Sequence, residues 1–370
     1  MENALALARR GLGTVWPNPA VGCVIAAEED PGGPQIVGRG WTQPGGRPHA
    51  ETEALARAGE RARGATAYVT LEPCSHHGKT PPCANALIDA GIGRIVIAVA
   101  DPDPRVSGRG IEMLKQAGIE VGIGLCAEEA LEINRGYFLR QSANRPFFSL
   151  KTATTLDSRI ATVNGASQWI TGPEARKFSH LLRASHDAIV VGARTATIDD
   201  PALTCRLPGL KKYSPVRIVT DSKLSIPPGQ ALVASAGDTA TWIYTTEYAE
   251  RARASELIDA GALVITVASR EDGRVDLKAM AADMAARGLT RVLVEGGGTL
   301  AAEFLLAGLI DRYYSIRHPA VIGGDGLAAI ASMDVRSLLE MIAFTYRASW
   351  SMGADFVEVF DRLTPQPIQE

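Results

Sequence analysis

A chain of 370 residues exceeds the usual ceiling for one compact core, so its length predicts two domains. Hydrophobic residues make up 46% of the chain and charged residues 21%, which is typical of a folded globular protein and excludes low-complexity disorder. The formal net charge of −3 gives no general attraction to polyanions, which argues against nucleic acid or an anionic membrane as partner.

Membrane insertion, secretion and a disulfide framework are not indicated either. No stretch reaches the roughly twenty apolar residues of a membrane span, and the opening MENALALARRGLG lacks the apolar run and cleavage site of a signal peptide. We therefore expect a cytoplasmic protein. Its five cysteines are an odd number spread over a long chain, so each is expected to be a metal ligand or a core residue. Cys23, Cys126 and Cys205 have apolar neighbours and are predicted core residues.

The first part of the chain alternates strand-like and helix-like segments, which predicts an α/β domain. Strands are predicted at residues 21–26, 66–71, 94–100 and 119–124, and helices at 50–63, from 83 onward, at 108–118 and at 127–140. Prolines before the helix at 83 and a glycine after it fit the usual asymmetry of helix ends. The polar segment 141–146 predicts a linker, so we expect domains at residues 1–143 and 144–370.

The second part alternates again and predicts a second α/β domain. Strands are expected at residues 147–153, 188–191, 216–221, 241–244, 262–267 and 291–294, with helices at 173–184, 247–260 and 276–287. Two late strand-like runs, 313–317 and 356–360, have no long helix between them. They predict an antiparallel edge on a sheet that is otherwise parallel.

Three potential metal ligands lie at the ends of predicted elements in the first domain. His49 precedes a helix, Cys74 follows a strand, and Cys83 begins the next helix. One imidazole and two thiolates suit zinc, and three protein ligands leave a fourth position for water, which predicts a catalytic zinc ion. Glu51 is placed to carry the proton of a water molecule whose pKa the metal lowers. His-x-Glu followed by Pro-Cys is the known signature of zinc nucleobase deaminases.

The spacing of the two cysteines departs from that signature, because eight residues separate Cys74 from Cys83 where two are usual. Cys83 still begins a helix, where the positive end of the helix dipole favours a thiolate. His76 and His77 lie in the extended loop and are alternative ligands. A structural zinc site, or cysteines buried only for packing, remain alternative explanations.

Six motifs in both halves of the chain carry a resemblance to a known family: PNPAVG at 17–22, HAE at 49–51, TLEPCSHHGKTPPC at 70–83, DPDP at 101–104, SQWIT at 167–171 and DDPALT at 199–204. Over nearly its whole length the sequence resembles the bacterial bifunctional deaminase-reductases of riboflavin biosynthesis. The extended cysteine spacing is this family's own form. The resemblance implies a cytidine-deaminase-like α/β/α domain followed by an α/β domain similar to dihydrofolate reductase.

The same resemblance implies two reactions on a small phosphorylated pyrimidine. The first domain would hydrolytically deaminate 2,5-diamino-6-(ribosylamino)pyrimidin-4-one 5′-phosphate with one zinc ion. The second would use NADPH to reduce the ribosyl group of 5-amino-6-(5-phosphoribosylamino)uracil to ribityl. We expect a homo-oligomer, without nucleic acid or membrane as partner. The alternatives are a zinc deaminase of nucleosides or tRNA joined to an unrelated C-terminal domain, and a zinc-stabilised regulatory module without activity.

A glycine turn at residues 294–299, VEGGGT, predicts a strand end and a helix start where backbone amides can approach a phosphate. The full dinucleotide-binding fingerprint is missing, so a turn that serves only packing is the alternative. The resemblance implies cofactor contacts at Ala153, Trp169, Thr195, Asp199, Ser222, Gly297, Gly298, Thr299, Leu300, Ala301, Ala302 and Glu303. It implies substrate contacts at Ser167, Arg183, Leu203, Arg206 and Glu295.

Several of these residues also permit a simpler explanation. Arg183 and Arg206 suit bidentate binding of a ribose phosphate, but a solvated surface position is the alternative. Lys151 and Asp199 are candidate catalytic groups of the reduction, Lys151 because its charge ends an apolar strand. Trp169 has a core aromatic as its alternative.

Two positions depart from the family's usual residues. Ser158 stands where family members have glycine in Leu-Asp-Gly-Arg, and His318-Pro319 interrupts a stretch that usually reads as a proline-lysine turn. If the backbone at Ser158 adopts a positive φ angle, the serine is expected to cost about 1 kcal/mol of local strain.

Overall fold

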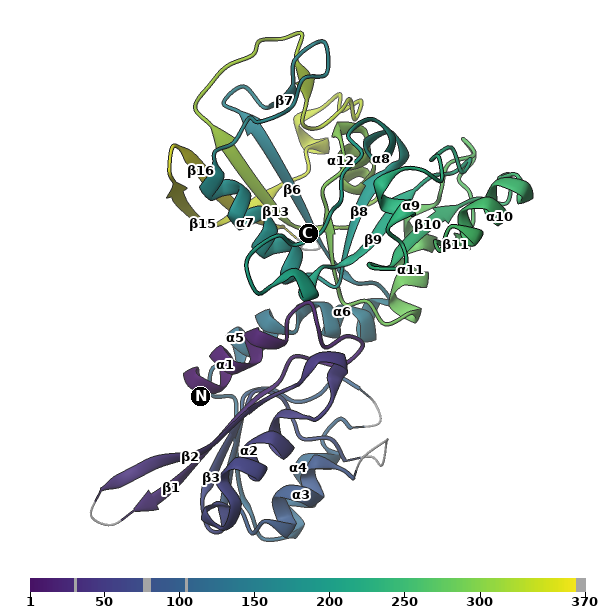
Figure 1. Ribbon diagram of the computed structural model, residues 1–370. Coiled ribbons are helices and arrows are strands. Elements are labelled where there is room, and N and C mark those ends of the chain that lie inside the picture. The colour runs from purple at the N-terminus through teal and green to yellow at the C-terminus, as the bar shows by residue number, and fades with distance from the viewer. Residues whose placement is uncertain (30–31, 76–80, 104–105, 364–370) are drawn as a thin grey trace. The chain divides into compact units, whose positions relative to one another are not determined.

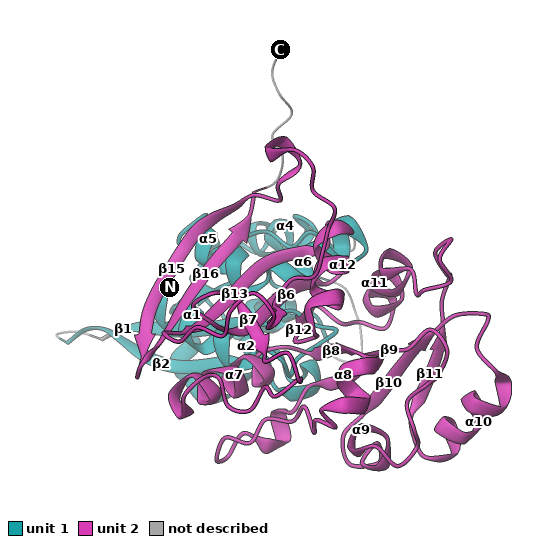
Figure 2. Cartoon of the chain, turned by 90° about the horizontal axis from the view of Figure 1, so that it is seen from above, with its two compact units in different colours: residues 1–145 teal, residues 146–370 magenta. Residues whose placement is uncertain are grey.

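The computed structural model describes residues 1–29, 32–75, 81–103 and 106–363, and the chain forms two compact units. Unit 1 is Met1–Arg145 and unit 2 is Pro146–Glu370, coloured separately in Figure 2. In the described part of the chain, no helix has both the length and the apolar character that crossing a bilayer would require.

Unit 1 is built on a five-stranded sheet in the order β2-β1-β3-β4-β5. Its first three strands, β1, β2 and β3, are labelled in Figure 1. The β1 strand pairs antiparallel with β2 and β3, whereas β3, β4 and β5 are parallel. Its strands are β1 (Gly22–Glu29), β2 (Gly33–Trp41), β3 (Thr66–Val69), β4 (Arg94–Ile97) and β5 (Glu120–Ile123). Its helices are α1 (Glu2–Ala8), α2 (Ala50–Ala58), α3 (Cys83–Asp89), α4 (Arg109–Gln116), α5 (Ala127–Ile133) and α6 (Arg135–Ala143).

The β2 strand was not predicted, and its glycines explain both the omission and the packing. Gly38 and Gly40 interrupt any alternating pattern, which hides the strand in the sequence. A Cβ atom at Gly40 would lie 2.0 Å from the carbonyl oxygen of Ala50, and one at Gly38 would lie 2.3 Å from that of Ala54. These glycines therefore allow α2, the helix that His49 precedes, to lie directly on the sheet.

Two predicted helices are interrupted. The run 50–63 ends as α2 at Ala58 and continues only as a short 3-10 turn, Gly59–Ala62. The run 127–140 breaks at Asn134, whose backbone leaves the helical region with φ −102° and ψ 16°. The buried Asn134 side chain donates a hydrogen bond to the carbonyl of Ala20 and accepts one from its amide. The break thus anchors the segment that leads into β1.

Unit 2 contains a nine-stranded sheet in the order β11-β10-β9-β8-β12-β6-β13-β16-β15. The strands from β11 to β13 in this order run parallel. The β16 strand pairs antiparallel with β13, as predicted, and β15, which was not predicted, pairs antiparallel with β16 at the edge of the sheet. Its strands are β6 (Phe147–Thr155), β8 (Ala188–Gly192), β9 (Val216–Thr220), β10 (Thr241–Thr245), β11 (Leu263–Thr266), β12 (Arg291–Val294), β13 (Ile310–His318), β15 (Phe344–Met352) and β16 (Asp355–Arg362), with a separate pair β7 (Arg159–Ala161) and β14 (Leu327–Ala328).

The helices of unit 2 connect these strands in the manner of an α/β fold. They are α7 (Pro173–Ala184), α8 (Ala193–Ile198), α9 (Ala231–Ala234), α10 (Arg251–Asp259), α11 (Leu277–Ala286) and α12 (Gly298–Leu306). Strand β12 lies between β6 and β8, in the middle of the sheet, although it comes late in the chain. The glycine turn that follows β12 therefore lies at the centre of the carboxyl edge, the edge formed by the carboxyl ends of the parallel strands. Ligands of α/β sheets bind at this edge.

Both departures from the family sequence are accommodated. Ser158 has a φ angle of 62°, so the expected left-handed backbone is present at this serine. His318 pairs through Nδ1 with Oδ1 of the fully buried Asp355 at 2.7 Å, which gives this residue a structural partner.

Candidate functional site

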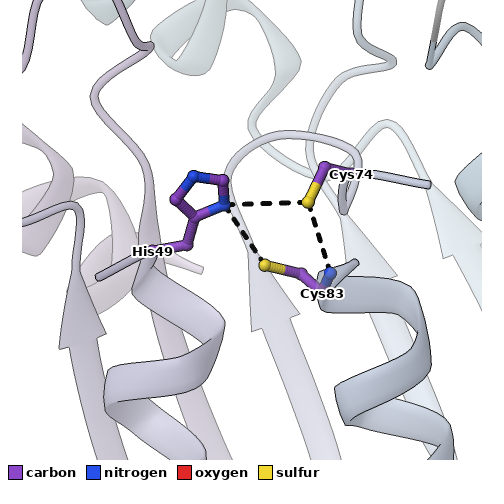
Figure 3. Close-up of side chains that lie close together, drawn as sticks. All are labelled: His49, Cys74 and Cys83. Atoms are coloured by element: carbon purple, nitrogen blue, oxygen red, sulfur yellow. Dashed lines mark hydrogen bonds between the residues drawn. The ribbon is translucent and has the colours of Figure 1, made fainter. Parts of the chain in front are cut away.

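The three predicted metal ligands of unit 1 converge. The Nδ1 atom of His49 lies 3.3 Å from Sγ of Cys83 and 3.7 Å from Sγ of Cys74, and the three ligand atoms all lie within 4.8 Å of one another. Figure 3 shows the imidazole facing both sulfur atoms, with the backbone amide of Cys83 directed at Cys74. His49 caps α2 and Cys83 begins α3, so two helix starts hold the cluster in place.

The spacing of these atoms fits a zinc ion. Zinc bonds of about 2.0–2.1 Å to nitrogen and about 2.3 Å to sulfur, set at a tetrahedral angle, separate nitrogen from sulfur by about 3.6 Å. The two observed separations, 3.3 and 3.7 Å, bracket that value. Three ligands on one side leave a tetrahedral position free, as in catalytic zinc sites.

Cys74 is electrostatically prepared for a cation. Its pKa is lowered to about 4, first by a hydrogen bond from the Cys83 thiol and then by contacts with His49 and the Cys83 amide, which outweigh the effect of burial. The hydrogen bond to Cys74 and burial raise the pKa of Cys83. The Cys74 thiolate thus places a negative charge at the centre of the cluster. A bound metal ion would take the place of the protons that the Cys83 thiol and the His49 ring share with it.

Glu51 lies in the first turn of α2 and is almost fully buried. Burial, followed by the negative charge of Cys74, raises the pKa of its carboxyl to about 7. Its carboxyl also hydrogen-bonds with Cys83, so it borders the ligand cluster directly. A carboxyl that exchanges its proton near neutral pH is suited to proton transfer.

No separate role was predicted for Glu72, whose carboxylate holds backbone segments close to Cys74 in the chain. Its buried carboxylate accepts four backbone hydrogen bonds, from Asp101, Gly108, Gly110 and Ile111, at 3.0–3.3 Å. The three later donors form the start of α4. His76 and His77, the alternative ligands, and Pro104 of the DPDP motif lie outside the described residues. Cys23 and Cys205 are buried as predicted, whereas Cys126 is only half-buried.

Unit 2 brings together three predicted site residues on β6, α7 and the end of β12. Arg183 donates two hydrogen bonds to Glu295, Nε to Oε1 at 3.0 Å and Nη2 to Oε2 at 2.9 Å, and Lys151 Nζ lies 3.5 Å from Oε2. Burial opposes ionisation of Glu295, but Arg183 and Lys151 lower its pKa to about 2. Lys151 does not end its strand as expected, because β6 continues to Thr155.

The bidentate face of Arg183 is therefore already engaged by Glu295, so it is not free to grip a phosphate in the same way. Arg206 is exposed, and among the residues that the structure describes no carboxylate pairs with it. Its Nε lies 3.4 Å from Nε2 of His180, a residue that sequence reasoning missed. A histidine three residues before Arg183 on one helix was the available signal.

The glycine turn after β12 has the features of a phosphate site. Gly297 caps the nine-residue α12 without a side-chain hydrogen bond to its first amides. A Cβ at Gly297 would first meet Oγ1 of Thr195 at 3.6 Å, so Thr195 borders the turn. At Gly298 a Cβ would lie 2.4 Å from the carbonyl oxygen of Ala328, which makes glycine obligatory there. Free amides at a helix start favour an anion.

Further along α12 the predicted cofactor residues are turned away from solvent. Leu300, Ala301 and Ala302 have buried side chains, and Glu303 is ion-paired with Arg270 and Arg274. Thr299 is exposed in the first turn. Only the start of this segment therefore presents polar atoms to a ligand.

The remaining predicted contacts lie on several segments of unit 2. Trp169 is 64% exposed and stacks under the guanidinium of Arg176, so it is not a core aromatic. Leu203 is buried with a φ angle of 51°, and the Ser222 hydroxyl accepts a hydrogen bond from the amide of Val275. Partial burial raises the pKa of Asp199 at the end of α8. Ser167 and Ala153 are half-buried.

These two sites define a two-unit protein with a deaminase-type cluster of zinc-ligand residues in one unit and an α/β sheet with a glycine turn at a helix start in the other. Comparisons with known proteins agree with both halves. Residues 1–99 match the cytidine and deoxycytidylate deaminase zinc-binding region, and residues 146–357 match the RibD C-terminal domain.

Relatives match over the whole length. Riboflavin biosynthesis protein RibD of Aquifex aeolicus is 40% identical, with 98% of this chain and 97% of the relative covered. RibD of Escherichia coli is also 40% identical, with 96% of each chain covered. The chain belongs to the RibD family of riboflavin biosynthesis proteins and combines a deaminase domain with a reductase domain.

Solved structures give the same result. The Acinetobacter baumannii RibD structure, form 1, has a TM-score of 0.86 at 35% identity and covers 98% of both chains. A Thermotoga maritima diaminohydroxyphosphoribosylaminopyrimidine deaminase/5-amino-6-(5-phosphoribosylamino)uracil reductase has a TM-score of 0.85 at 32% identity, with 98% and 97% covered. The predicted fold class is thereby confirmed. The alternative of an unrelated C-terminal domain is not favoured, because that part matches RibD.

Proposed function

We propose that this chain catalyses two reactions of riboflavin biosynthesis on a small phosphorylated pyrimidine. Unit 1 would hydrolytically remove the 2-amino group of 2,5-diamino-6-(ribosylamino)pyrimidin-4-one 5′-phosphate. Unit 2 would reduce the ribosyl group of 5-amino-6-(5-phosphoribosylamino)uracil to ribityl with NADPH. The observation that carries the proposal is the buried Glu51 carboxyl beside His49, Cys74 and Cys83, in a chain that matches RibD throughout.

In unit 1, His49, Cys74 and Cys83 would hold the metal, because their donor atoms have the chemistry and spacing that zinc requires. Bound zinc supplies a Lewis acid that makes water nucleophilic near neutral pH. Glu51 accepts a proton on a carboxylate oxygen and delivers it to the substrate, for which its raised pKa of about 7 is suited. Its burial excludes bulk water, so the proton moves between few partners.

The decisive test of unit 1 replaces Glu51 and measures zinc and ammonia separately. Glu51→Gln is expected to retain zinc and lower ammonia release at least about a hundredfold, because only the proton carrier is lost. Glu53→Gln on the same helix, where the native carboxylate pairs with Arg57, is the matched control and should stay active. Cys83→Ser should lower zinc content, and His77→Ala should not. Unchanged ammonia release in Glu51→Gln would exclude the proposed role.

In unit 2, NADPH is proposed to lie along the carboxyl edge of the sheet, with its pyrophosphate at the start of α12. Three observations support this placement: the uncapped helix start at Gly297, the neighbouring Thr195 hydroxyl, and the obligatory glycine at Gly298. Lys151 and Arg206 would meet the phosphorylated substrate, Lys151 from strand β6, which lies next to β12. When bound, the nicotinamide supplies the hydride.

NADPH oxidation by the zinc-loaded full chain tests unit 2. With the deaminated pyrimidine phosphate as substrate, absorbance in the nicotinamide band should fall, and NADH should be a poorer donor. Lys151→Ala should slow this oxidation while ammonia release by unit 1 stays unchanged. If the intact chain does not oxidise NADPH with this substrate, the reductase half of the proposal is wrong.

Self-association is proposed through the outer edge of the unit 2 sheet. The β15 strand is nine residues long and forms the edge of the sheet. Around it the large apolar side chains of Leu338, Leu339, Tyr346 and Phe356 are each at least half exposed. An exposed edge strand with apolar neighbours can pair antiparallel with a second copy about a two-fold axis. Analytical ultracentrifugation should detect a dimer, and Tyr346→Lys should dissociate it.

A further inference from the structure

His180 is a half-buried histidine on α7 that none of the motifs assigns to a site. It lies one helical turn before Arg183 and faces the segment that carries Leu203 and Arg206. Its Nδ1 lies 3.1 Å from the carbonyl oxygen of Thr204, and its Nε2 lies 3.4 Å from Nε of Arg206. The imidazole therefore bridges helix α7 and a cation that is proposed to bind substrate.

These contacts select one tautomer of His180. The guanidinium of Arg206 can only donate, so Nε2 must be the acceptor, and the ring proton then resides on Nδ1. The Nδ1–H group then donates a hydrogen bond to the Thr204 carbonyl at 3.1 Å. The backbone amide of Arg206 also approaches Nδ1, but at 3.4 Å, which is the weaker contact. This tautomer gives up only the Arg206 amide contact at Nδ1, whereas the opposite tautomer would give up the contacts with both the Thr204 carbonyl and Nε of Arg206.

The surroundings of His180 oppose its protonation. Burial lowers its pKa, and the positive charges of Arg183 and Arg206 lower it further, while the Thr204 carbonyl and the more distant Glu295 act in the other direction. The neutral ring is thus the resting form at neutral pH. Protonation would replace the acceptor at Nε2 with a donor and place a third positive charge beside the two arginines.

We propose that His180 is a positioning residue that fixes the guanidinium of Arg206 for the phosphorylated substrate, and that only the neutral imidazole can do so. This inference rests on the proposed reductase function. Arg206 needs such a partner because it is exposed and is not held by a carboxylate in the described residues. A long side chain that is oriented in advance loses less conformational freedom when the phosphate binds. Arg183 cannot take its place, since Glu295 occupies its bidentate face.

Two conservative variants separate the two contacts of the ring. The side-chain amide of His180→Asn reaches the position of Nδ1, so it keeps the donor to Thr204 and loses the acceptor for Arg206. The longer side chain of His180→Gln places an oxygen near the position of Nε2, so it keeps the acceptor and loses the Thr204 donor. Both variants and wild type are prepared as zinc-loaded full chains. Ammonia release by unit 1 and NADPH affinity serve as controls for folding.

The positioning role predicts a split between KM and kcat. In His180→Asn the KM for the phosphorylated reductase substrate should rise about five- to tenfold, the value of one ordinary intramolecular hydrogen bond, while kcat changes less. His180→Gln should stay within about twofold of wild type. In wild type the KM should also rise as the pH falls below the ordinary histidine value of about 6.5, and His180→Gln should lose this component.

Two results would overturn the inference. A KM that is raised in His180→Gln but not in His180→Asn would assign the role to the Thr204 contact alone. A KM that is unchanged in both variants, with a wild-type pH profile, would leave Arg206 oriented without the imidazole. Failure of the proposed function is distinguishable, because wild type itself would then not oxidise NADPH. In that case the inference falls together with the reductase assignment.

Discussion

Replacing Glu72 with glutamine tests how the loop and helix beside the metal ligands are held. The Glu72 carboxylate is 3% exposed and lies two residues before Cys74. Its Oε2 accepts from the amides of Asp101 and Gly108 at 3.2 and 3.1 Å, and its Oε1 accepts from Gly110 and Ile111 at 3.0 and 3.3 Å. Four backbone donors, three of them at the start of α4, thus depend on one side chain.

The expected loss follows from this arrangement. Glutamine keeps one acceptor oxygen and places an amide NH2 where the other oxygen was, so two buried N–H groups lose their acceptor. Each buried donor left without an acceptor costs about 1–3 kcal/mol. Loss of a negative charge at a helix start adds about 0.3–1 kcal/mol. We therefore expect Glu72→Gln to lower the free energy of local opening by about 2–7 kcal/mol.

Amide hydrogen exchange measured by mass spectrometry is the appropriate assay, because it reports on this segment without requiring the whole chain to unfold. At about 1.4 kcal/mol per factor of ten, amides in the peptide covering the start of α4 should exchange at least about fortyfold faster. Glu112→Gln is the matched control, because it removes a negative charge from the same first turn of α4, where the exposed carboxylate accepts a hydrogen bond from the Gln116 side chain. Its exchange should rise only about two- to fivefold, the value of the lost charge alone.

Unchanged exchange at the start of α4 in Glu72→Gln would refute the reasoning, since the donors would then be satisfied without the carboxylate. Faster exchange spread evenly over unit 1 would refute it equally, because it would indicate global destabilisation. Zinc content measured in the same samples shows whether displacement of the α4 start also disturbs Cys74.

Three further predictions concern unit 2. Gly298→Ala should abolish NADPH oxidation, because its Cβ would lie 2.4 Å from a backbone carbonyl oxygen. Gly297→Ala has room to fold and should only weaken NADPH binding. Titration with NADPH measures both effects, and ammonia release by unit 1 is the control for folding. Ser158→Gly should stabilise unit 2 by about 0.5–1 kcal/mol, because φ is 62° there, and a melting temperature that falls would contradict the strain. Burial lowers the pKa of His186 to about 3, whereas the pKa of histidine in the unfolded chain is about 6.5. The contribution of the neutral ring to the free energy of unfolding should therefore be complete above about pH 6.5 and should decline as the pH falls from there toward about 3. His186→Gln should flatten this decline in thermal melts.

The metal cluster was accessible to sequence reasoning because each ligand marks the end of a local element. His49 and Cys83 begin helices that their own neighbours define, and Cys74 follows a short buried strand. Glu51 is fixed relative to His49 by the first turn of α2. A short-range pattern therefore carried enough information to predict which side chains converge.

The partners of Glu72 were not accessible in this way. The residue stood in a recognised motif, but its four donors follow 29–39 positions later in the chain. All four are backbone amides, and an amide is present at nearly every residue, so no side-chain type marks them. The β15 strand was missed although its sequence does alternate, with apolar residues at 344, 346, 348, 350 and 352 separated by polar ones. Such alternation indicates a strand, so in this case the signal was present in the sequence.

The charge balance in unit 2 depends on strand order, which the sequence does not reveal. Insertion of β12 between β6 and β8 pairs Val294 with Leu150, so the following residues, Glu295 and Lys151, become neighbours. Arg183 then joins Glu295 from α7 and Arg206 lies beyond it, next to neutral His180. Three positive side chains and one ionised carboxylate leave this cluster with a charge of about +2, matched to a phosphate group of about −1.5 to −2. A chain with a net charge of −3 attracts no polyanion in general, yet it concentrates positive charge at the one place where a phosphorylated substrate is proposed to bind.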